Sequence, residues 1–386
     1  MAHSERKHAL LSASGASRWM NCTPSARLEE HFVEEESSIY AEEGTLAHEF
    51  GDLALKKYAG LITTRKYGAE VKKLKTNELY SPEMDGEVQK YVDLVVEQFR
   101  TAQKHTSDAV LSIEERLDLT SYIENGFGTG DAIIIADGTL QIIDLKYGKG
   151  IKVDAENNPQ LMLYGLGSLE ANELFYDIHT VEMSIVQPRL DHYSTWKISA
   201  EALKAWANKE VKPAAVKAYA GEGLQNAGYW CTFCKAAPRC STLASANMKL
   251  IDDEFSDPHL LKDVHMVEIF NKSSQITKWI NAVAGYMLKE ALSGKDWPGL
   301  KLVEGRSVRK WRDEHEVMEL LSEYDDTQIL NVKLKGIGDI EKLLGKKQFA
   351  EALNDVIIKP EGSPTLVNKS DPRQELNNAE NDFKDL

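Results

Sequence analysis

The spacing of hydrophobic residues predicts helices in the first hundred residues of the chain. Leu46, Phe50 and Leu53 recur at helical spacing, and a second helical pattern covers about residues 82–104. Beyond residue 109 the period changes, because short segments rich in branched side chains are separated by glycine and aspartate. These segments predict three adjacent strands at residues 110–119, 131–136 and 140–145, the last two joined by a turn at Asp137-Gly138.

A helix is predicted after the third strand. Asn158 is a good N-cap and Pro159 is favoured at the first helical position, so the helix begins there and runs to about residue 170. Two more strands are predicted at residues 180–187 and 193–198. Ser199 then caps a helix that reaches about residue 219.

The pattern changes again beyond residue 246. It predicts a long amphipathic helix near residues 260–292, a hairpin at residues 299–311 and shorter helices to about residue 355. The segment from residue 359 is rich in Pro, Asn and Asp and is typical of a disordered tail. We therefore predict a domain at residues 1–245, a mostly helical domain with a basic hairpin at 246–358 and a disordered acidic tail at 359–386.

The chain is acidic, with 46 basic against 61 acidic side chains among its 386 residues and a net charge of −15. This balance argues against a protein that coats nucleic acid by bulk attraction, so any contact with phosphates must be local. No apolar run approaches the roughly 18 residues that a membrane-spanning helix requires. We therefore expect a soluble, cytoplasmic protein with no membrane contact.

Two aspartates are expected to meet at one end of the predicted sheet. Asp131 begins one strand and Asp144 ends its hairpin partner, so antiparallel pairing across the short turn brings them level, and Lys146 shares the face of Asp144. Converging carboxylates suit Mg²⁺ or Mn²⁺, and a lysine beside them can orient a water and stabilise negative charge on a phosphate. The pattern indicates phosphodiester hydrolysis; an aspartate in a turn and a surface Asp/Lys pair are the ordinary alternative.

Three further residues can face the same site. His48 lies off the apolar stripe of Leu46 and Phe50, which leaves it free to face a site rather than the core. Gln160 and Tyr164 are four residues apart on one helix face just after the Asp-x-Lys strand, so both can reach one cleft. A surface histidine and a partly buried tyrosine would produce the same pattern.

The motifs occur in a fixed order: GTLAH with His48, GTGD with Asp131, IIDLKYG with Asp144 and Lys146, and QLMLY with Gln160 and Tyr164. This order resembles the RecB-like branch of the PD-(D/E)XK nuclease superfamily. The resemblance implies an α/β, restriction-endonuclease-like core with a central mixed sheet flanked by helices. It also implies site roles: His48, Asp131, Asp144 and the Leu145 carbonyl as metal ligands, Lys146 as the catalytic lysine, and Gln160 and Tyr164 as residues that position DNA.

The four cysteines are placed unevenly. Cys231, Cys234 and Cys240 come from one short segment and Cys22 lies far upstream, and together they offer four thiolates to one metal site. The arrangement resembles the iron–sulfur branch of the same nucleases, in which one early and three late cysteines hold a [4Fe–4S] cluster that clamps the nuclease domain shut. A structural Zn²⁺ ion and free buried cysteines are the alternatives.

Basic residues cluster despite the acidic total. Lys149 and Lys152 follow the Asp-x-Lys strand directly, so we expect them to contact DNA. The predicted hairpin can hold a phosphate backbone and stack a base, or else form a solvated charged surface, through three residues: Arg309, Lys310 and Trp311.

Together these patterns predict a Mg²⁺- or Mn²⁺-dependent DNA nuclease, and specifically an exonuclease. The region beyond residue 246 is similar to phage-encoded proteins catalogued as a domain of unknown function, which implies phage DNA replication or recombination in the bacterial host cytoplasm. A single-strand-binding or annealing protein is a candidate partner, and oligomer formation is open. The rival hypotheses are a non-catalytic DNA-binding or scaffold component of a recombination complex and a zinc-binding or redox interaction protein.

Overall fold

The structure is a computed structural model of the chain, and it describes residues 9–32, 38–252, 263–301, 303 and 336–353. The chain divides into two compact units, Met1–Glu290 and Ala291–Leu386. The domain boundaries predicted near residues 245 and 358 stay predictions. The predicted tail and most of the predicted hairpin, including Arg309, Lys310 and Trp311, lie outside the described residues.

The described elements follow one another in this order: η2 (Ala13–Gly15), α1 (Ala16–Asn21), α2 (Ser25–Glu29), α3 (Ile39–Tyr58), α4 (Thr64–Leu74), α5 (Pro82–His105), β1 (Val110–Asp118), β2 (Phe127–Ala136), β3 (Thr139–Leu145), α6 (Pro159–Asn172), β4 (Thr180–Gln187), η3 (Pro188–Leu190), β5 (His192–Ser199), α7 (Ala200–Trp206), the π-helical η4 (Ala207–Val211), α8 (Lys212–Ala220), η5 (Tyr229–Phe233), η6 (Ala237–Arg239), α9 (Ser241–Asp252), α10 (Asp263–Leu292), α13 (Ile337–Leu344) and α14 (Lys346–Leu353).

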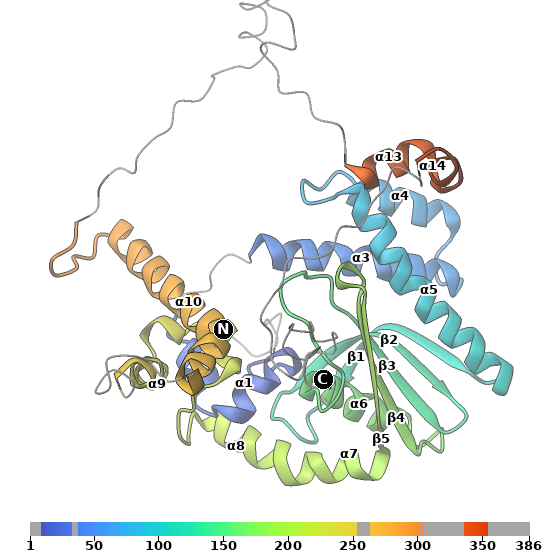
Figure 1. Cartoon of the computed structure of the whole chain (residues 1–386). Helices are drawn as coiled ribbons and strands as arrows, with labels where there is room; N and C mark the ends of the chain where they lie inside the picture. The colour runs from blue at the N-terminus through green and yellow to red at the C-terminus, as the bar shows by residue number, and fades with distance from the viewer. Residues whose placement is uncertain (1–8, 33–37, 253–262, 302, 304–335, 354–386) are drawn as a thin grey trace, which may run out of the picture. The chain divides into compact units, whose positions relative to one another are not determined.

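The five strands form one mixed sheet in the order β1-β2-β3-β4-β5 (Figure 1). β1, β2 and β3 are antiparallel neighbours, α6 crosses over to β4, which is parallel to β3, and β5 is antiparallel to β4. At the β2–β3 turn, Asp137 and Gly138 have φ values of 47° and 71°, because a favoured two-residue hairpin needs positive φ at both central residues. The predicted α/β class, with a central mixed sheet flanked by helices, is confirmed.

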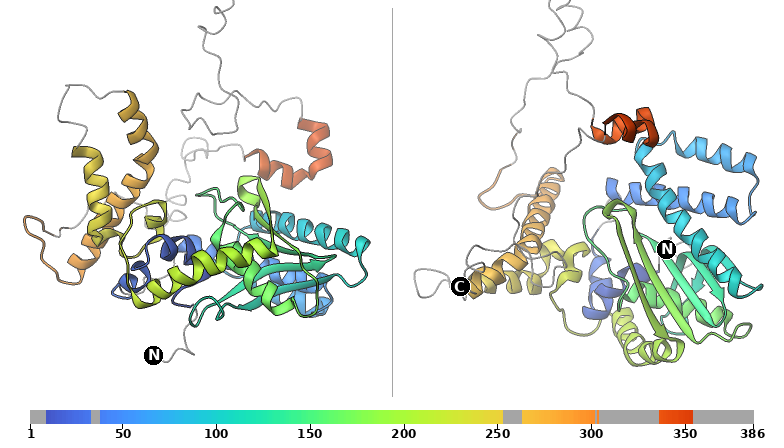
Figure 2. Two further views of the ribbon diagram at one scale, coloured as in Figure 1. Left: turned by 90° about the horizontal axis from the view of Figure 1, so that it is seen from below. Right: turned by 45° about the vertical axis from the view of Figure 1, so that its right-hand side comes forward.

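Helices cover both faces of the sheet (Figures 1 and 2). Ala132 and Ile134 of β2 belong to the core that also contains residues of α3 and α5, whereas Ile133 and Ile135 belong to the core formed with α1, α6, α7 and α8. Burial on both faces explains why β2 is a continuous apolar run rather than an alternating one. The central strands therefore lie between two hydrophobic cores.

The predicted helices correspond to α3, α5, α6 and the α7–α8 pair. The Asn158 side chain accepts hydrogen bonds from the backbone N–H groups of Gln160 and Leu161, which confirms the predicted N-cap. Figure 2 shows α7, η4 and α8 following one another as one long helix. The π-helical turn η4 lies in the middle of it, just before Pro213. That turn suits a proline, whose ring and missing N–H disturb the regular hydrogen-bond ladder.

None of the described helices combines the length and apolar character of a bilayer-spanning segment.

Candidate metal centre

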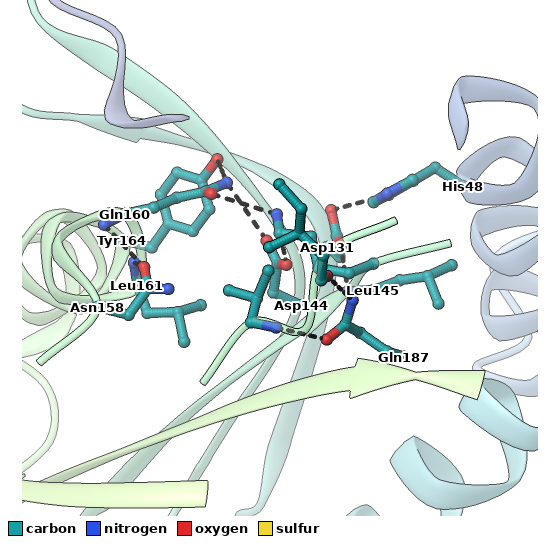
Figure 3. A network of polar contacts seen from close by, with 12 residues as sticks. His48, Asp131, Asp144, Leu145, Asn158, Gln160, Leu161, Tyr164 and Gln187 are labelled. Carbon is teal, nitrogen blue, oxygen red and sulfur yellow. Dashed lines mark hydrogen bonds and ion pairs between the residues drawn. The ribbon is translucent and has the colours of Figure 1, made fainter. Parts of the chain in front are cut away.

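Two aspartates converge on neighbouring strands. The pairing of Ala132 with Ile143 places Asp131 of β2 level with Asp144 of β3, and Figure 3 shows the two side chains close together. Oδ2 of Asp131 accepts a hydrogen bond of 2.8 Å from the backbone N–H of Leu145, whose side chain is buried. The predicted meeting of the two aspartates is confirmed, although Asp131 lies within β2 rather than at its start.

Lys146 stands directly after β3 and beside Asp144. Its backbone N–H donates to the carbonyl of Val186 at 2.9 Å, which continues the alignment of β3 with β4. Its Nζ lies 2.7 Å from Oδ2 of Asp144 and donates to Oε1 of Gln160 at 3.2 Å. Asp144 is only 2% exposed. The lysine therefore has a fixed position between a buried carboxylate and an amide.

Gln160 and Tyr164 reach the carboxylates from the first turns of α6 (Figure 3). Nε2 of Gln160 donates to the hydroxyl of Tyr164 at 2.9 Å and to Oδ1 of Asp144 at 3.4 Å. The Tyr164 ring packs on Gly128 of β2, where a Cβ atom would come within 2.7 Å of the ring. Both residues therefore join the Asp144 network, as their helical spacing predicts, and a glycine in β2 makes room for one of them.

His48 approaches from α3, on the opposite side of Asp131 from α6 (Figure 3). Its Nδ1 lies 3.2 Å from Oδ1 of Asp131, while Leu46 and Phe50 are buried in the core. Burial by itself lowers the pKa of His48, but the carboxylate of Asp131 outweighs this and raises the pKa of His48 to about 9. The prediction that His48 faces a site rather than the core agrees with this geometry.

Glu114 of β1 is a further site residue that the sequence patterns did not single out. Its carboxylate, the imidazole of His48 and a carboxylate oxygen of Asp131 all lie within 4.8 Å of one another. Glu114 has a φ of 51°, and the regular pairing of β1 with β2 is interrupted at this residue, opposite Asp131. Burial raises the pKa of Glu114 to about 7, and the Asp131 carboxylate adds to the rise.

The arrangement of charges fits a divalent cation. Burial raises the pKa of both aspartates, but His48 outweighs it for Asp131, whose pKa falls below its usual range, whereas the pKa of Asp144 stays raised. Oδ2 of Asp144 has Nζ of Lys146 as its partner at 2.7 Å, whereas the buried hydroxyl of Tyr91 makes no hydrogen bond among the described residues. Unsatisfied buried polar atoms are costly. Carboxylate oxygens with one imidazole are ligands that suit Mn²⁺ and Mg²⁺, so the residues present fit such an ion.

The cysteines are four free thiols. Cys22 is buried. Burial raises the pKa of the Cys231 thiol, and the nearby thiols of Cys240 and Cys22 add to the rise. Burial raises the pKa of Cys234 to about 12. In the described part of the chain, no three metal-ligand atoms within 4.8 Å include a cysteine sulfur. A tetrahedral Zn²⁺ site, with bonds of about 2.3 Å, would hold its sulfurs roughly 3.8 Å apart, so the thiols do not form a closed Zn²⁺ site.

Two of the five residues predicted to contact DNA lie in the described part of the chain. Nζ of Lys149 lies 3.4 Å from a carboxylate oxygen of Glu83, and both side chains are about half exposed. Lys152 is exposed on the loop between β3 and α6. Lys152 lines the same pocket as Lys146 and Gln160, and its role in binding DNA stays a prediction.

Fold and site together define an α/β protein whose mixed five-stranded sheet carries a cluster of carboxylate, imidazole and lysine groups. The chain belongs to the family described as "Protein of unknown function (DUF2800)", whose model matches residues 8–374. It is also similar to a solved structure titled "Crystal structure of SSO0001", at 18% sequence identity and a TM-score of 0.22, over 57% of this chain and 95% of that chain. A similarity at this level carries no argument about fold or activity.

Proposed function

We propose that this chain is a Mg²⁺- or Mn²⁺-dependent deoxyribonuclease with a PD-(D/E)XK core of the RecB-like type, and that it acts as an exonuclease. One observation carries the proposal: His48, Asp131, Asp144 and Lys146, from three different elements, meet at one point. Clustered carboxylates beside a lysine are suited to hydrolysing phosphodiesters, because the reaction needs a positioned cation and a group that offsets charge on the phosphate.

In this proposal each residue has a distinct task. His48, Asp131 and Asp144 would hold the metal ion, with the Leu145 carbonyl as a further ligand. The ion, when bound, supplies charge stabilisation at the phosphate and lowers the pKa of a water. Nζ of Lys146, fixed 2.7 Å from Asp144, is placed to orient the attacking water and to offset charge that develops on the phosphate.

Gln160 and Tyr164 act on the substrate and on the lysine. Gln160 accepts a hydrogen bond from Lys146 and donates one to Tyr164, so the three side chains hold one another in place. The Tyr164 hydroxyl stays protonated at neutral pH, because burial raises its pKa above the ordinary value. It can therefore donate a hydrogen bond to a phosphate oxygen while its ring stays packed on Gly128.

The proposal includes a [4Fe–4S] cluster on Cys22, Cys231, Cys234 and Cys240, with structural Zn²⁺ as the alternative. Its support is that the two segments are already joined by protein contacts, shown by a donation from the backbone N–H of Lys235 to Glu29 at 2.8 Å. A cluster spaces its sulfurs farther apart than one Zn²⁺ ion does. Its sulfurs therefore need not come as close together as those of a Zn²⁺ site.

We also propose the biological setting implied by the motifs: phage DNA replication or recombination in the host cytoplasm, with DNA as substrate and a single-strand-binding or annealing protein as partner. The predicted basic hairpin beyond residue 298 would add to DNA binding. The family description names no activity, so this setting depends on the proposed chemistry.

The test is cleavage of end-labelled linear and circular DNA by anaerobically purified protein with Mg²⁺, Mn²⁺ or a chelator. We expect metal-dependent loss of linear DNA only. Lys146→Ala should abolish cleavage in a protein that still folds, which circular dichroism and a cooperative thermal unfolding transition check. The matched control is Lys197→Ala, which removes an exposed lysine on β5 that pairs with Glu182. That variant should cleave normally.

Two results would reject the proposal. Retained cleavage in Lys146→Ala or Asp144→Ala would show that the chemistry lies elsewhere. Tight DNA binding by folded, metal-loaded protein without any cleavage would favour the non-catalytic scaffold instead.

A further inference from the structure

A groove runs from Lys146 and Gln160 to the cysteine segment. It has a volume of about 500 Å³. One wall is the loop between β3 and α6, at residues 151–160, and the other is made by residues 13–18 and by η5. We call it the loop groove. It is continuous with the proposed active site through those two residues.

Two aromatic rings stand exposed in the loop groove. Tyr229 is 69% exposed and Phe233 is 73% exposed. Both are anchored: the Tyr229 hydroxyl accepts a hydrogen bond of 3.1 Å from Oγ of Ser17, and the carbonyl of Phe233 accepts one of 3.3 Å from Arg18. Tyr229 is held through its hydroxyl and Phe233 through its backbone carbonyl, and exposed aromatic rings at fixed positions are suited to stacking against another planar group.

Trp230 also lines the loop groove and packs against Tyr229. Its ring meets that of Tyr229 edge to face, with centroids 5.2 Å apart, and its Nε1 donates to the carbonyl of Asn226 at 2.9 Å. The indole lies so close to Gly228 that a Cβ atom there would come within 2.5 Å of the ring. The orientation of Tyr229 is thus fixed by packing before any ligand arrives, which lowers the entropy cost of binding.

The opposite wall is fixed to the sheet. The buried side chain of Gln187 donates to the carbonyl of Ile151 at 2.9 Å and accepts from the backbone N–H of Val153 at 2.7 Å (Figure 3). The backbone N–H of Ala155 donates to Oγ of Ser194 at 3.0 Å. Lys152 is held between these anchors with its side chain exposed, and no ion pair of Lys152 occurs among the described residues. The loop therefore presents a cation to the groove at a fixed place.

We propose that the loop groove binds single-stranded DNA and leads it to Lys146. Unpaired bases stack on Tyr229 and Phe233, and Lys152 contacts the backbone. That the ligand is DNA rests on the proposed function. A single strand is favoured because side chains can stack only on bases that are unpaired and exposed. Asp154 and Glu156 also line the groove, and they disfavour the dense double row of phosphates of a duplex.

The test is fluorescence anisotropy with a labelled oligo-dT and with a duplex of equal length. Each variant is made in an Asp144→Ala background without divalent metal, so that cleavage does not interfere. Phe233→Ala and Tyr229→Ala should each weaken oligo-dT binding about 5- to 150-fold, the effect expected for loss of one stacked aromatic, and should change duplex binding little. Phe233→Trp, which keeps a stacking ring, should retain oligo-dT binding.

The matched control is Phe175→Ala, which removes a ring that is 80% exposed outside the groove. It should leave both affinities and the thermal unfolding curve unchanged. The proposal is overturned if Phe233→Ala binds oligo-dT as tightly as this control, or if it weakens oligo-dT and duplex equally. The chemistry is followed separately through Mn²⁺-dependent hydrolysis of bis(p-nitrophenyl) phosphate by the wild type and by Asp144→Ala. Failure of the groove to bind single-stranded DNA and absence of the proposed phosphodiester hydrolysis are therefore distinguishable.

Discussion

Glu114 offers a test of the site at the level of a single residue. Glu114→Gln keeps the size of the side chain but removes one of the three groups that lie within 4.8 Å of one another. Because Mg²⁺ and Mn²⁺ prefer ionised carboxylates, we expect Mn²⁺ affinity to fall by roughly 10-fold or more, the loss that even residues around a metal's direct ligands produce. Titration followed by electron paramagnetic resonance of free Mn²⁺ measures this change.

The neighbouring carboxylate provides the control. Glu115→Gln changes the same kind of group one position along β1, outside the group that can hold an ion, and should leave Mn²⁺ affinity within about twofold of the wild type. Equal affinities for the Glu114 and Glu115 variants would remove Glu114 from the metal centre.

The different predictability of these residues has a physical reason. Asp131, Asp144 and Lys146 follow from strand alternation across a two-residue turn, which is local geometry. His48 was placed by its position off the apolar stripe of α3. Glu114 enters the site because its φ of 51° departs from strand geometry, and a glutamate within a partly polar edge strand carries no such signal. Tyr229 and Phe233 were missed because exposure of an aromatic depends on packing that is distant in sequence.

At the level of elements, the site depends on how closely α6 approaches the sheet. A Cβ atom at Gly167 of α6 would come within 2.9 Å of the Leu117 Cβ and 3.1 Å of the Asp118 carbonyl in β1. Neither atom can move without moving the strand. Gly167→Ala should therefore shift α6, lower the free energy of unfolding by about 1–3 kcal/mol and weaken cleavage, because Gln160 would move from Asp144. Urea unfolding and the cleavage assay measure the two effects.

Gly86 of α5 is the matched glycine. A Cβ atom there meets nothing within 4 Å, so Gly86→Ala should stabilise the protein by about 0.5–1 kcal/mol through helix propensity and leave cleavage unchanged. If Gly167→Ala is as stable and as active as this control, the position of α6 is not what places Gln160 and Tyr164.

The five strands and the helices α3, α5, α6, α7–α8 and α10 were predictable because their signals are local, whereas α1, α2, α4 and α9 were not predicted. The Asp137-Gly138 turn and the Asn158-Pro159 helix start depend only on neighbouring residues. The π-helical turn before Pro213 was not predicted, because it is a local response to a proline inside an otherwise regular helix. Likewise the early start of β2 at Phe127 is set by pairing with β1, which a strand's own sequence does not specify.

At the level of the whole molecule, the N-terminal helices and the cysteine segment are joined although they are distant in sequence. Trp19 is buried in the main core. Nε of Arg27 donates to the carbonyl of Tyr219 at 2.7 Å, and the backbone of Lys235 is bound by Glu29. The sequence pointed to this junction only through the four cysteines. The structure shows that packing and hydrogen bonds join these segments.

Cys22→Ser tests whether a metal centre closes this junction. The cross-link it would remove spans about 200 residues, and closing so long a loop stabilises a protein by roughly 5 kcal/mol in the chain-entropy model, or roughly 6 °C in Tm for a chain of this size. We expect Cys22→Ser to lose iron or zinc, measured by elemental analysis after anaerobic purification, and to unfold at a correspondingly lower temperature.

Cys231→Ser should lose the same metal to the same extent, because both sulfurs would bind one centre. A Cys22→Ser protein that keeps its metal and its Tm while Cys231→Ser loses both would show that the early cysteine is a buried core residue. The helix–segment junction would then be held by the Arg27 and Glu29 contacts.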